Sequence, residues 1–257
     1  MLKSKEDIVE NWLYRYTGTE PAKFGKYILL VNFNKYLEIL SDEMHVEISG
    51  LDKSMPNVTV GNITMINFGM GSPNAATIMD LLTAIQPKAV LFLGKCGGVK
   101  DQNQVGDLIL PIAAIRGEGT SNDYFPPEVP SLPAFSLEKA ISQTIIDYGR
   151  DYWTGTVYTT NRRVWEHDED FKDYLRTIKV IAVDMETATL FSVGFKNSIP
   201  TGALLLVSDK PMVAEGIKTD ESDKHVTENF VEKQVAIGYK SLEHLINNGI
   251  AVKHLRY

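Results

Sequence analysis

The sequence predicts an α/β protein, a single three-layer α/β/α domain with a central, mostly parallel, twisted sheet. Its apolar runs, such as residues 89–93 and 203–207, are continuous rather than alternating, which is typical of strands buried on both faces. Amphipathic segments of helical length separate these runs, as in folds that place helices on both faces of a sheet. No repeat, low-complexity tract or linker divides the chain, so we expect one domain over residues 1–257.

The composition is that of an ordinary globular protein, with 257 residues of which 44% are hydrophobic and 23% charged. Lys and Arg number 26 against 33 Asp and Glu, and the net charge of −7 disfavours binding to nucleic acids or membrane surfaces. No apolar run approaches the roughly 20 residues that span a bilayer. Charged residues among the first twelve argue against a signal peptide. The single cysteine, Cys96, excludes an internal disulfide, so we expect a cytoplasmic protein.

Each expected element follows from a local pattern. Ser4 caps a helix over residues 4–16, with acidic residues in its first turn and apolar residues at helical spacing behind them. Pro73 begins a helix that Pro87 ends, because proline is tolerated only in the first helical turn. Four prolines make residues 122–134 a loop. Further helices are expected at 137–148, 184–195 and 223–246, and strands at 27–31, 45–48, 58–60, 63–68, 89–93, 107–115 with a break at Pro111, from Trp153 onward, 180–183 and 203–207.

Several familiar motifs are incomplete. The turn GKCGG at residues 94–98 lacks the first glycine and the Ser/Thr of a P-loop, and GMGSPN at 69–74 lacks the third glycine of a dinucleotide fingerprint. The five histidines and Cys96 show no metal-ligand spacing, and no Gly-x-Ser-x-Gly elbow is present. We therefore expect neither a metal nor a bound cofactor.

Polar residues gather where the expected strands end, which is where α/β sheets bind ligands. Gly71 and Ser72 follow one strand and lead into a helix N-terminus, whose free N–H groups attract an anion; a plain tight turn is the equally supported alternative. Four cations also follow strands, and together they would form a pocket for a phosphate group, although each alone is more often a solvated surface charge. They are Lys95, Arg116, Arg162 and Arg163.

Two acidic segments are the main catalytic candidates. Asp184 and Glu186 follow the strand at 180–183; Asp184 fits an N-cap, and Glu186 fits either a partner of the helix dipole or an acceptor for a sugar diol. Asp209 follows five apolar residues, where a carboxyl group is expected to be partly desolvated, and desolvation raises a carboxyl pKa. Lys210 should point the other way along the strand. Asp209 is therefore a candidate general acid, the alternative being a residue that caps the next loop.

With these residues the sequence resembles the purine/uridine nucleoside phosphorylase superfamily. The resemblance lies in DMETA at 184–188, SD at 208–209 and the two glycine turns GMG and GKCGG. Two longer strings, ILPIAAIRGEGTSNDYFPP at 109–127 and YTTNRRVWEHD at 158–168, are similar to the AMP nucleosidase family. The similarity extends over nearly the whole chain, and strings of this length are specific.

The resemblance implies a nucleoside phosphorylase-like fold, a hexamer, and hydrolysis of AMP to adenine and ribose 5-phosphate. Asp209 would protonate purine N7, Glu186 would hold the ribose hydroxyls and Met185 would contact the sugar. Trp165 would stack on adenine, although a packed core tryptophan is equally supported. The remaining substrate-binding positions are expected to be Gly71, Ser72, Ser121, Ser208 and the four cations.

Departures from the phosphorylase pattern bear on the nucleophile. Phosphorylases carry a Pro-Gly-Asp-Pro turn where this chain has residues 31–34, and an arginine where it has Phe92. Losing both removes most of an orthophosphate site, so water is the expected nucleophile. A phosphorylase or a methylthioadenosine-type nucleosidase of the same fold is the enzymatic alternative, and a non-catalytic nucleotide-binding module is the other. Because the first strand is expected at residue 27, we expect no separate regulatory domain.

Overall fold

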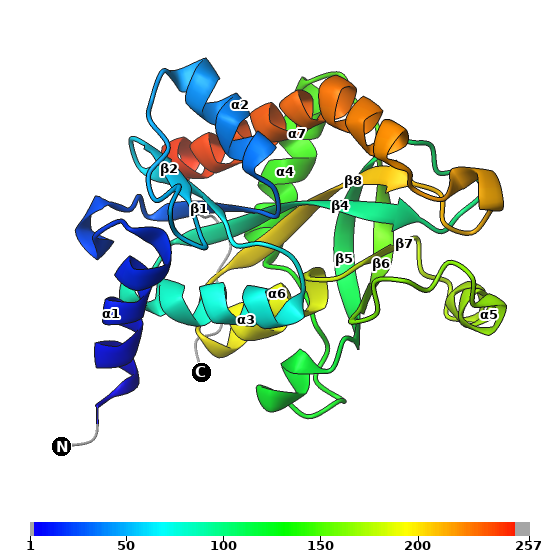
Figure 1. Ribbon diagram of the computed structural model, residues 1–257, viewed down its shortest axis with the longest axis horizontal. Coiled ribbons are helices and arrows are strands. Elements are labelled where there is room, and N and C mark those ends of the chain that lie inside the picture. The colour runs from blue at the N-terminus through cyan, green and yellow to red at the C-terminus, as the bar shows by residue number, and fades with distance from the viewer. Residues whose placement is uncertain (1–2, 250–257) are drawn as a thin grey trace.

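The computed structural model describes residues 3–249, which form an eight-stranded sheet with helices on both faces (Figure 1). The strand order is β2-β3-β1-β4-β7-β6-β5-β8, and most neighbours are parallel. The strands are β1 (Tyr27–Val31), β2 (Asn57–Val60), β3 (Ile63–Asn67), β4 (Ala89–Gly98), β5 (Leu108–Gly117), β6 (Tyr152–Thr160), β7 (Ala182–Asp184) and β8 (Thr201–Asp209). The helices are α1 (Lys5–Thr17), α2 (Asn34–Met44), α3 (Ser72–Leu81), α4 (Phe135–Asp147), α5 (Glu169–Thr177), α6 (Thr187–Lys196) and α7 (Asp220–Asn248).

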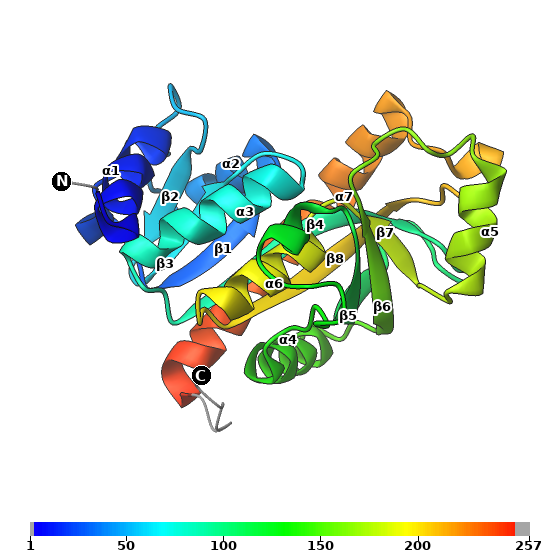
Figure 2. The same ribbon diagram turned by 90° about the horizontal axis from the view of Figure 1, so that it is seen from below.

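The predicted α/β architecture is confirmed, with helices layered on the two faces of the sheet. Helices α1, α3 and α6 lie on one face and α2, α4 and α7 on the other, while α5 stands apart at the end formed by β6 and β7 (Figures 1 and 2). Each layer encloses its own hydrophobic core. Within residues 3–249, no helix combines the length and the apolar composition needed to cross a bilayer.

β1 illustrates why the apolar runs are continuous. All five of its residues are buried. Ile28 and Leu30 belong to the core under α1, α3 and α6, whereas Leu29 and Val31 belong to the core under α2, α4 and α7. Since successive side chains point to opposite faces, a strand covered on both sides needs an apolar residue at every position. Fully burying each such side chain stabilises the fold by about 1.5–3 kcal/mol.

The predicted three-layer arrangement of a twisted sheet is corrected at one end, where five strands close into a barrel. β8 pairs in parallel with β4 and antiparallel with β5, and the pairings β5–β6, β6–β7 and β7–β4 complete the ring. Register shifts after Cys96 in β4 and after Pro111 in β5 mark bulges. Bulges bend a strand and increase its twist, which lets a sheet curl far enough to close.

Most predicted elements are confirmed to within a few residues, and the exceptions have local causes. β5 is one strand through Pro111, because the bulge accommodates the missing N–H. The strand predicted at 45–48 is wrong: His45 ends α2 in the left-handed conformation, with φ of 54°. α6 begins at Thr187 rather than at residue 184, because Asp184 is the last residue of β7.

Two helices are absent from the predictions. α2 has Phe33 at its N-cap, with no side-chain capping bond, so it lacks the usual start signal. α5 is strongly polar, with Lys172 and Leu175 as its buried residues. It does start with a recognisable cap, since the Asp168 side chain accepts a hydrogen bond from the Phe171 N–H. The pattern of apolar residues alone therefore underestimates short, half-exposed helices.

Glu138 on α4 is a buried acid with a raised pKa. It is 8% exposed, both of its carboxyl oxygens are without a hydrogen-bond partner among the described residues, and burial raises its pKa from 4.5 to about 8. Between these two pH values the unfolded chain is ionised while the folded chain keeps its proton. The free energy of unfolding should therefore fall as the pH rises from 4.5 to about 8.

Glu138→Gln should remove this penalty. We expect the variant to match the wild type below pH 4.5 and to exceed its free energy of unfolding by roughly 2–4 kcal/mol above pH 8. Urea unfolding across this pH range measures the difference. Glu10→Gln, which changes an exposed glutamate of α1, is the matched control and should leave the pH dependence unchanged. Parallel pH curves for the wild type and Glu138→Gln would contradict the assignment.

Candidate active site

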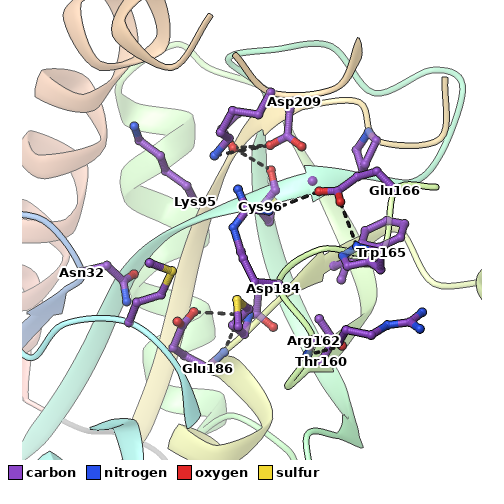
Figure 3. A pocket seen from close by; sticks show the side chains of 18 of the residues that line it. Asn32, Lys95, Cys96, Thr160, Arg162, Trp165, Glu166, Asp184, Glu186 and Asp209 are labelled. Carbon is purple, nitrogen blue, oxygen red and sulfur yellow. Dashed lines mark hydrogen bonds and ion pairs between the residues drawn. The ribbon is translucent and has the colours of Figure 1, made fainter. Parts of the chain in front are cut away.

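A cavity of about 240 Å³ opens where several strands end (Figure 3). Its walls come from the residues that follow β1 and β3, from the ends of β4, β6, β7 and β8, and from the first turn of α7. This is the edge at which the sequence places its candidate residues. The lining residues are Asn32, Phe33, Met70, Lys95, Cys96, Gly97, Thr160, Arg162, Arg163, Trp165, Glu166, Val183, Asp184, Met185, Glu186, Ser208, Asp209, Pro211, Lys218 and Asp223.

Glu186 is fixed on one wall by the glycine turn that follows β3. Its Oε1 accepts a hydrogen bond from the Gly71 backbone N–H at 2.7 Å, and its Oε2 accepts one from the Met185 N–H at 3.3 Å. Gly71 has a φ of 94°, a backbone conformation that favours glycine. Burial, together with the charge of Asp184, raises the pKa of Glu186 to about 8. A carboxyl group fixed in this way keeps lone pairs for further hydrogen bonds, which suits the hydroxyls of a sugar diol.

Asp184 stands beside Glu186 and holds the start of α6. Its Oδ1 accepts from the Thr159 hydroxyl at 2.7 Å, and its Oδ2 accepts from the backbone N–H and the hydroxyl of Thr187 at 2.7 and 2.5 Å. Burial raises the pKa of Asp184, although these hydrogen bonds oppose the rise. The carboxylate caps the helix as predicted, but it does so from the end of β7.

Ser72 lies outside the cavity lining. It is 2% exposed, and its hydroxyl donates to the Met185 carbonyl at 2.6 Å. Together with the bond from Gly71 to Glu186, this contact joins the N-terminus of α3 to the segment after β7. At this helix N-terminus the Gly71 N–H already donates to the Glu186 carboxyl group, and substrate binding by Gly71 and Ser72 stays a prediction.

Asp209 ends β8 at the other end of the cavity from Glu186 (Figure 3). It is 9% exposed, and its Oδ1 accepts a hydrogen bond from the Ser208 hydroxyl at 2.6 Å. Lys210 points away, as strand alternation predicts, and donates to the Asp101 carbonyl at 2.9 Å. A different cation, Lys218, lies 3.5 Å from the same Oδ1 atom. Asp209 is thus largely buried, and it has a positively charged lysine beside it.

Three of the four predicted cations line the cavity, and each is already paired with an acid. Lys95 Nζ lies 2.9 Å from Asp223 Oδ1, and its side chain is 6% exposed. Burial lowers the pKa of Lys95, although the hydrogen bond to Asp223 opposes this shift. The two arginines are about half exposed, with Arg162 bound to Asp168 at 2.7 Å and Arg163 bound to Glu166 at 3.2 Å.

Arg116 and Ser121 do not line the cavity, and their assignment as substrate-binding residues stays a prediction. The Arg116 guanidinium donates to the Ser121 hydroxyl at 2.8 Å and to the carbonyls of its own proline-rich loop. That loop has more carbonyls than N–H groups, because proline has no N–H, so a guanidinium with five donors can bind the surplus carbonyls. These acceptors are Pro126, Val129 and Phe125, with the Asn122 side chain as a fourth.

Trp165 packs in the core and also lines the cavity. It is 5% exposed and packs edge-to-face on Phe171, with ring centroids 5.2 Å apart. The packed-core interpretation is therefore confirmed, and the same residue forms part of the cavity wall. Stacking on adenine stays a prediction. Cys96, also in the wall, is buried, and burial raises the pKa of its thiol well above the usual value, so it is a poor nucleophile.

Several lining residues were outside the sequence predictions. Asn32 follows β1 and donates from Nδ2 to the Gly69 carbonyl at 2.7 Å, so the strand-end rule could have found it. Lys218 and Asp223 precede and begin α7, and no local signal places that segment over the cavity. Among residues 3–249, no group of three His, Cys, Asp or Glu side chains is arranged to hold a metal ion.

The fold agrees with a family comparison. The model of the Phosphorylase superfamily matches residues 27–246, and the chain belongs to this superfamily. Within it, the chain is 57% identical to AMP nucleosidase from Bacteroides thetaiotaomicron, whose crystal structure superposes with a TM-score of 0.86 over 95% of this chain and 99% of that one. The resemblance inferred from the sequence is confirmed.

More distant relatives define the limits of this comparison. AMP nucleosidase from Escherichia coli K12 is 27% identical over 92% of this chain, which spans only 58% of the length of that relative. Uridine phosphorylase from Vibrio fischeri is 21% identical, with a TM-score of 0.76 over 86% of this chain and 93% of that one. At that identity the likeness concerns the fold alone.

Proposed function

We propose that this protein hydrolyses the N-glycosidic bond of AMP to adenine and ribose 5-phosphate. The observation that carries the proposal is the placement of Asp209 and Glu186 in one cavity, at the ends of β8 and β7, the two strands that flank β4 in the barrel. The 57% identity to an AMP nucleosidase over 95% of the chain supports the choice of reaction and substrate.

Asp209 is the proposed acid for the leaving base. Cleavage of the N-glycosidic bond places negative charge on the purine, and a proton delivered near N7 stabilises it. The Ser208 hydroxyl donates a hydrogen bond to Oδ1 at 2.6 Å and so fixes the orientation of the carboxyl group. Trp165 supplies a rigid ring in the wall on which adenine can stack.

Glu186 and Met185 are the proposed sugar contacts. The carboxyl group of Glu186 is held by backbone N–H groups rather than by mobile side chains, so its position is set before substrate binds. Hydrogen bonds from the ribose hydroxyls to this group strengthen as the sugar becomes oxocarbenium-like, because electron density is then needed at C1′. Contacts that tighten in the transition state increase kcat.

Water is the proposed nucleophile. Phe92, which replaces the arginine of phosphorylases, is fully buried and packs edge-to-face on Phe68 with centroids 5.8 Å apart. Asn32 and Phe33 line the cavity where the phosphate turn of phosphorylases begins. Apolar packing in place of a guanidinium supports hydrolysis over phosphorolysis.

The products distinguish hydrolysis from phosphorolysis. Incubated with AMP, the protein should release adenine and ribose 5-phosphate at the same rate with and without added inorganic phosphate. Chromatography of the base and of the phosphorylated sugar measures both products. Formation of ribose 1,5-bisphosphate that requires phosphate would instead identify a phosphorylase. Release of base from methylthioadenosine but not from AMP would identify the other alternative.

The proposed assembly rests on the resemblance, and the proposed compartment rests on the single cysteine and the charged residues among the first twelve. We infer a homo-hexamer in the cytoplasm, with AMP as the small-molecule partner and no role for nucleic acids or membranes. Light scattering that gives the mass of a single chain at micromolar concentration would contradict the assembly.

A further inference from the structure

A substrate that carries a phosphate dianion needs cations in the cavity, yet every lining cation is already engaged. Among residues 3–249, the cavity is lined by Lys95, Lys218, Arg162 and Arg163, and each lies within 3.5 Å of a carboxylate oxygen. A phosphate that binds through the donors now used by a carboxylate must displace that carboxylate. The question is which carboxylate the phosphate replaces.

The arginine pairs are local. Arg162 binds Asp168 and Arg163 binds Glu166, so each pair lies within one short segment between β6 and α5. The Arg162 guanidinium also lies 4.9 Å from the centre of the Phe171 ring. Both side chains are about half exposed, where solvent screening weakens ionic contacts.

The lysine pair is different because two chain segments converge on one oxygen atom. Lys95 comes from β4 and Lys218 from the loop before α7, and their Nζ atoms lie 2.9 and 3.5 Å from the same atom, Asp223 Oδ1. The Lys95 and Lys218 side chains are 6% and 23% exposed. One anionic oxygen held by two enclosed ammonium groups is the arrangement that a phosphate oxygen would require.

Asp223 itself is free to leave this position. It lies in the first turn of α7, its side chain is 38% exposed, and a rotation toward solvent would break no backbone hydrogen bond. Burial alone would raise its pKa, but the hydrogen bond and charge of Lys95, with the charge of Lys218, hold the pKa below its usual value. Asp223 is thus an anion at neutral pH, and it would compete with a phosphate for Lys95 and Lys218.

We infer that Lys95 and Lys218 form the subsite for the 5′-phosphate of the substrate, and that Asp223 fills this subsite as a substitute anion until the substrate displaces it. Lys218 also lies 3.5 Å from Asp209 Oδ1, so the subsite and the proposed acid share one cavity. The inference rests on the proposed function for the identity of the ligand. It adds that Lys95 and Lys218 bind the phosphate and that Asp223 competes with it.

The test measures binding rather than turnover. Asp223→Asn keeps the size and a hydrogen-bond acceptor for Lys95 but removes the competing charge. Isothermal titration with ribose 5-phosphate should then give a dissociation constant roughly three- to tenfold lower than for the wild type. The reason is that the side chain at position 223 occupies the subsite in a smaller fraction of the protein. The affinity for unphosphorylated ribose should not change. Asp223→Ser provides a second variant with the same expectation.

Asp168→Asn is the matched control. It is also an aspartate-to-asparagine change in an ion pair with a lining cation, and asparagine keeps the N-cap of α5. The control should leave the affinity for ribose 5-phosphate unchanged. If Asp223→Asn and Asp223→Ser bind ribose 5-phosphate no tighter than the wild type, the inference is wrong. It is equally wrong if Asp168→Asn tightens binding as much, because the effect is then general or belongs to Arg162.

Failure of the inference and failure of the proposed function can be told apart. Adenine release from AMP is measured on the wild type alone. A wild type that releases no adenine contradicts the proposed function, whereas the titration still tests whether Asp223 competes with a sugar phosphate. A wild type that hydrolyses AMP, together with an unchanged affinity in Asp223→Asn, contradicts the inference only.

Discussion

Asp209→Asn should lower kcat for AMP by about 10²–10⁴, the usual contribution of general acid–base catalysis. Asparagine has the same size, and it can still accept the hydrogen bond that Ser208 now donates to Oδ1 at 2.6 Å. The fold should therefore remain intact, as circular dichroism and the melting temperature would verify. The carboxamide cannot transfer a proton to the purine, so the loss should fall on kcat rather than on KM.

Asp107→Asn is the control for this variant. Asp107 lies just before β5, and its Oδ2 accepts a hydrogen bond from Trp153 Nε1 at 2.7 Å, outside the cavity lining. Removing this charge should leave turnover within about twofold, since surface changes of this kind have small effects. If Asp209→Asn turns over AMP like the wild type, the acid is another residue, and Asp209 is a structural cap of the loop that follows β8.

AMP should be preferred over adenosine by roughly a hundredfold or more in kcat/KM. Two charge-assisted contacts to the phosphate contribute about 1.5–3 kcal/mol each, and every ~1.4 kcal/mol is a factor of ten. Adenosine offers no dianion, so it cannot displace Asp223 from Lys95. Steady-state assays with both substrates measure the ratio. Similar kcat/KM values would remove the argument for a phosphate subsite.

Lys95→Met assigns this preference to one residue. The variant should lose roughly ten- to hundredfold in kcat/KM for AMP while changing little with adenosine. Lys172→Met is the matched control, because Lys172 is equally enclosed, with 6% of its side chain exposed, and pairs with Glu169 at 2.8 Å on α5. Equal losses with both substrates would mean that Lys95 supports the cavity rather than the phosphate.

Local patterns were sufficient to predict most strands and the edge at which the site forms. β1 is apolar at every position and β8 is apolar over residues 203–207, and such a run identifies a strand covered on both faces without any knowledge of its neighbours. Asp209 and Glu186 were found in the same way, since each is an acid within a few residues of a buried strand. These inferences succeed because they depend on interactions between residues close in the sequence.

The closure of the barrel could not be predicted in this way. It depends on β8 pairing with both β4 and β5, and these strands are separated along the chain by several helices. The bulges that bend β4 and β5 have no distinctive sequence apart from Pro111. An apolar run has the same appearance in an open sheet and in a barrel, so the predicted twisted sheet did not include the closure at this end.

The cations of the site show the same division between what the sequence predicts and what the tertiary structure decides. The sequence alone determined that Lys95, Arg116, Arg162 and Arg163 follow strands, that Asp209 and Glu186 do so too, and that the chain resembles a superfamily of nucleoside-cleaving enzymes. Only the tertiary structure decided that Arg116 turns back to the carbonyls of its own loop and that Lys95 meets Asp223, 128 residues further along the chain. The physical reason is that a backbone pattern places a side chain at a strand end, whereas the partner of its charge depends on how the following loop folds, as for Arg116, or on which distant segment packs beside it, as for Lys95.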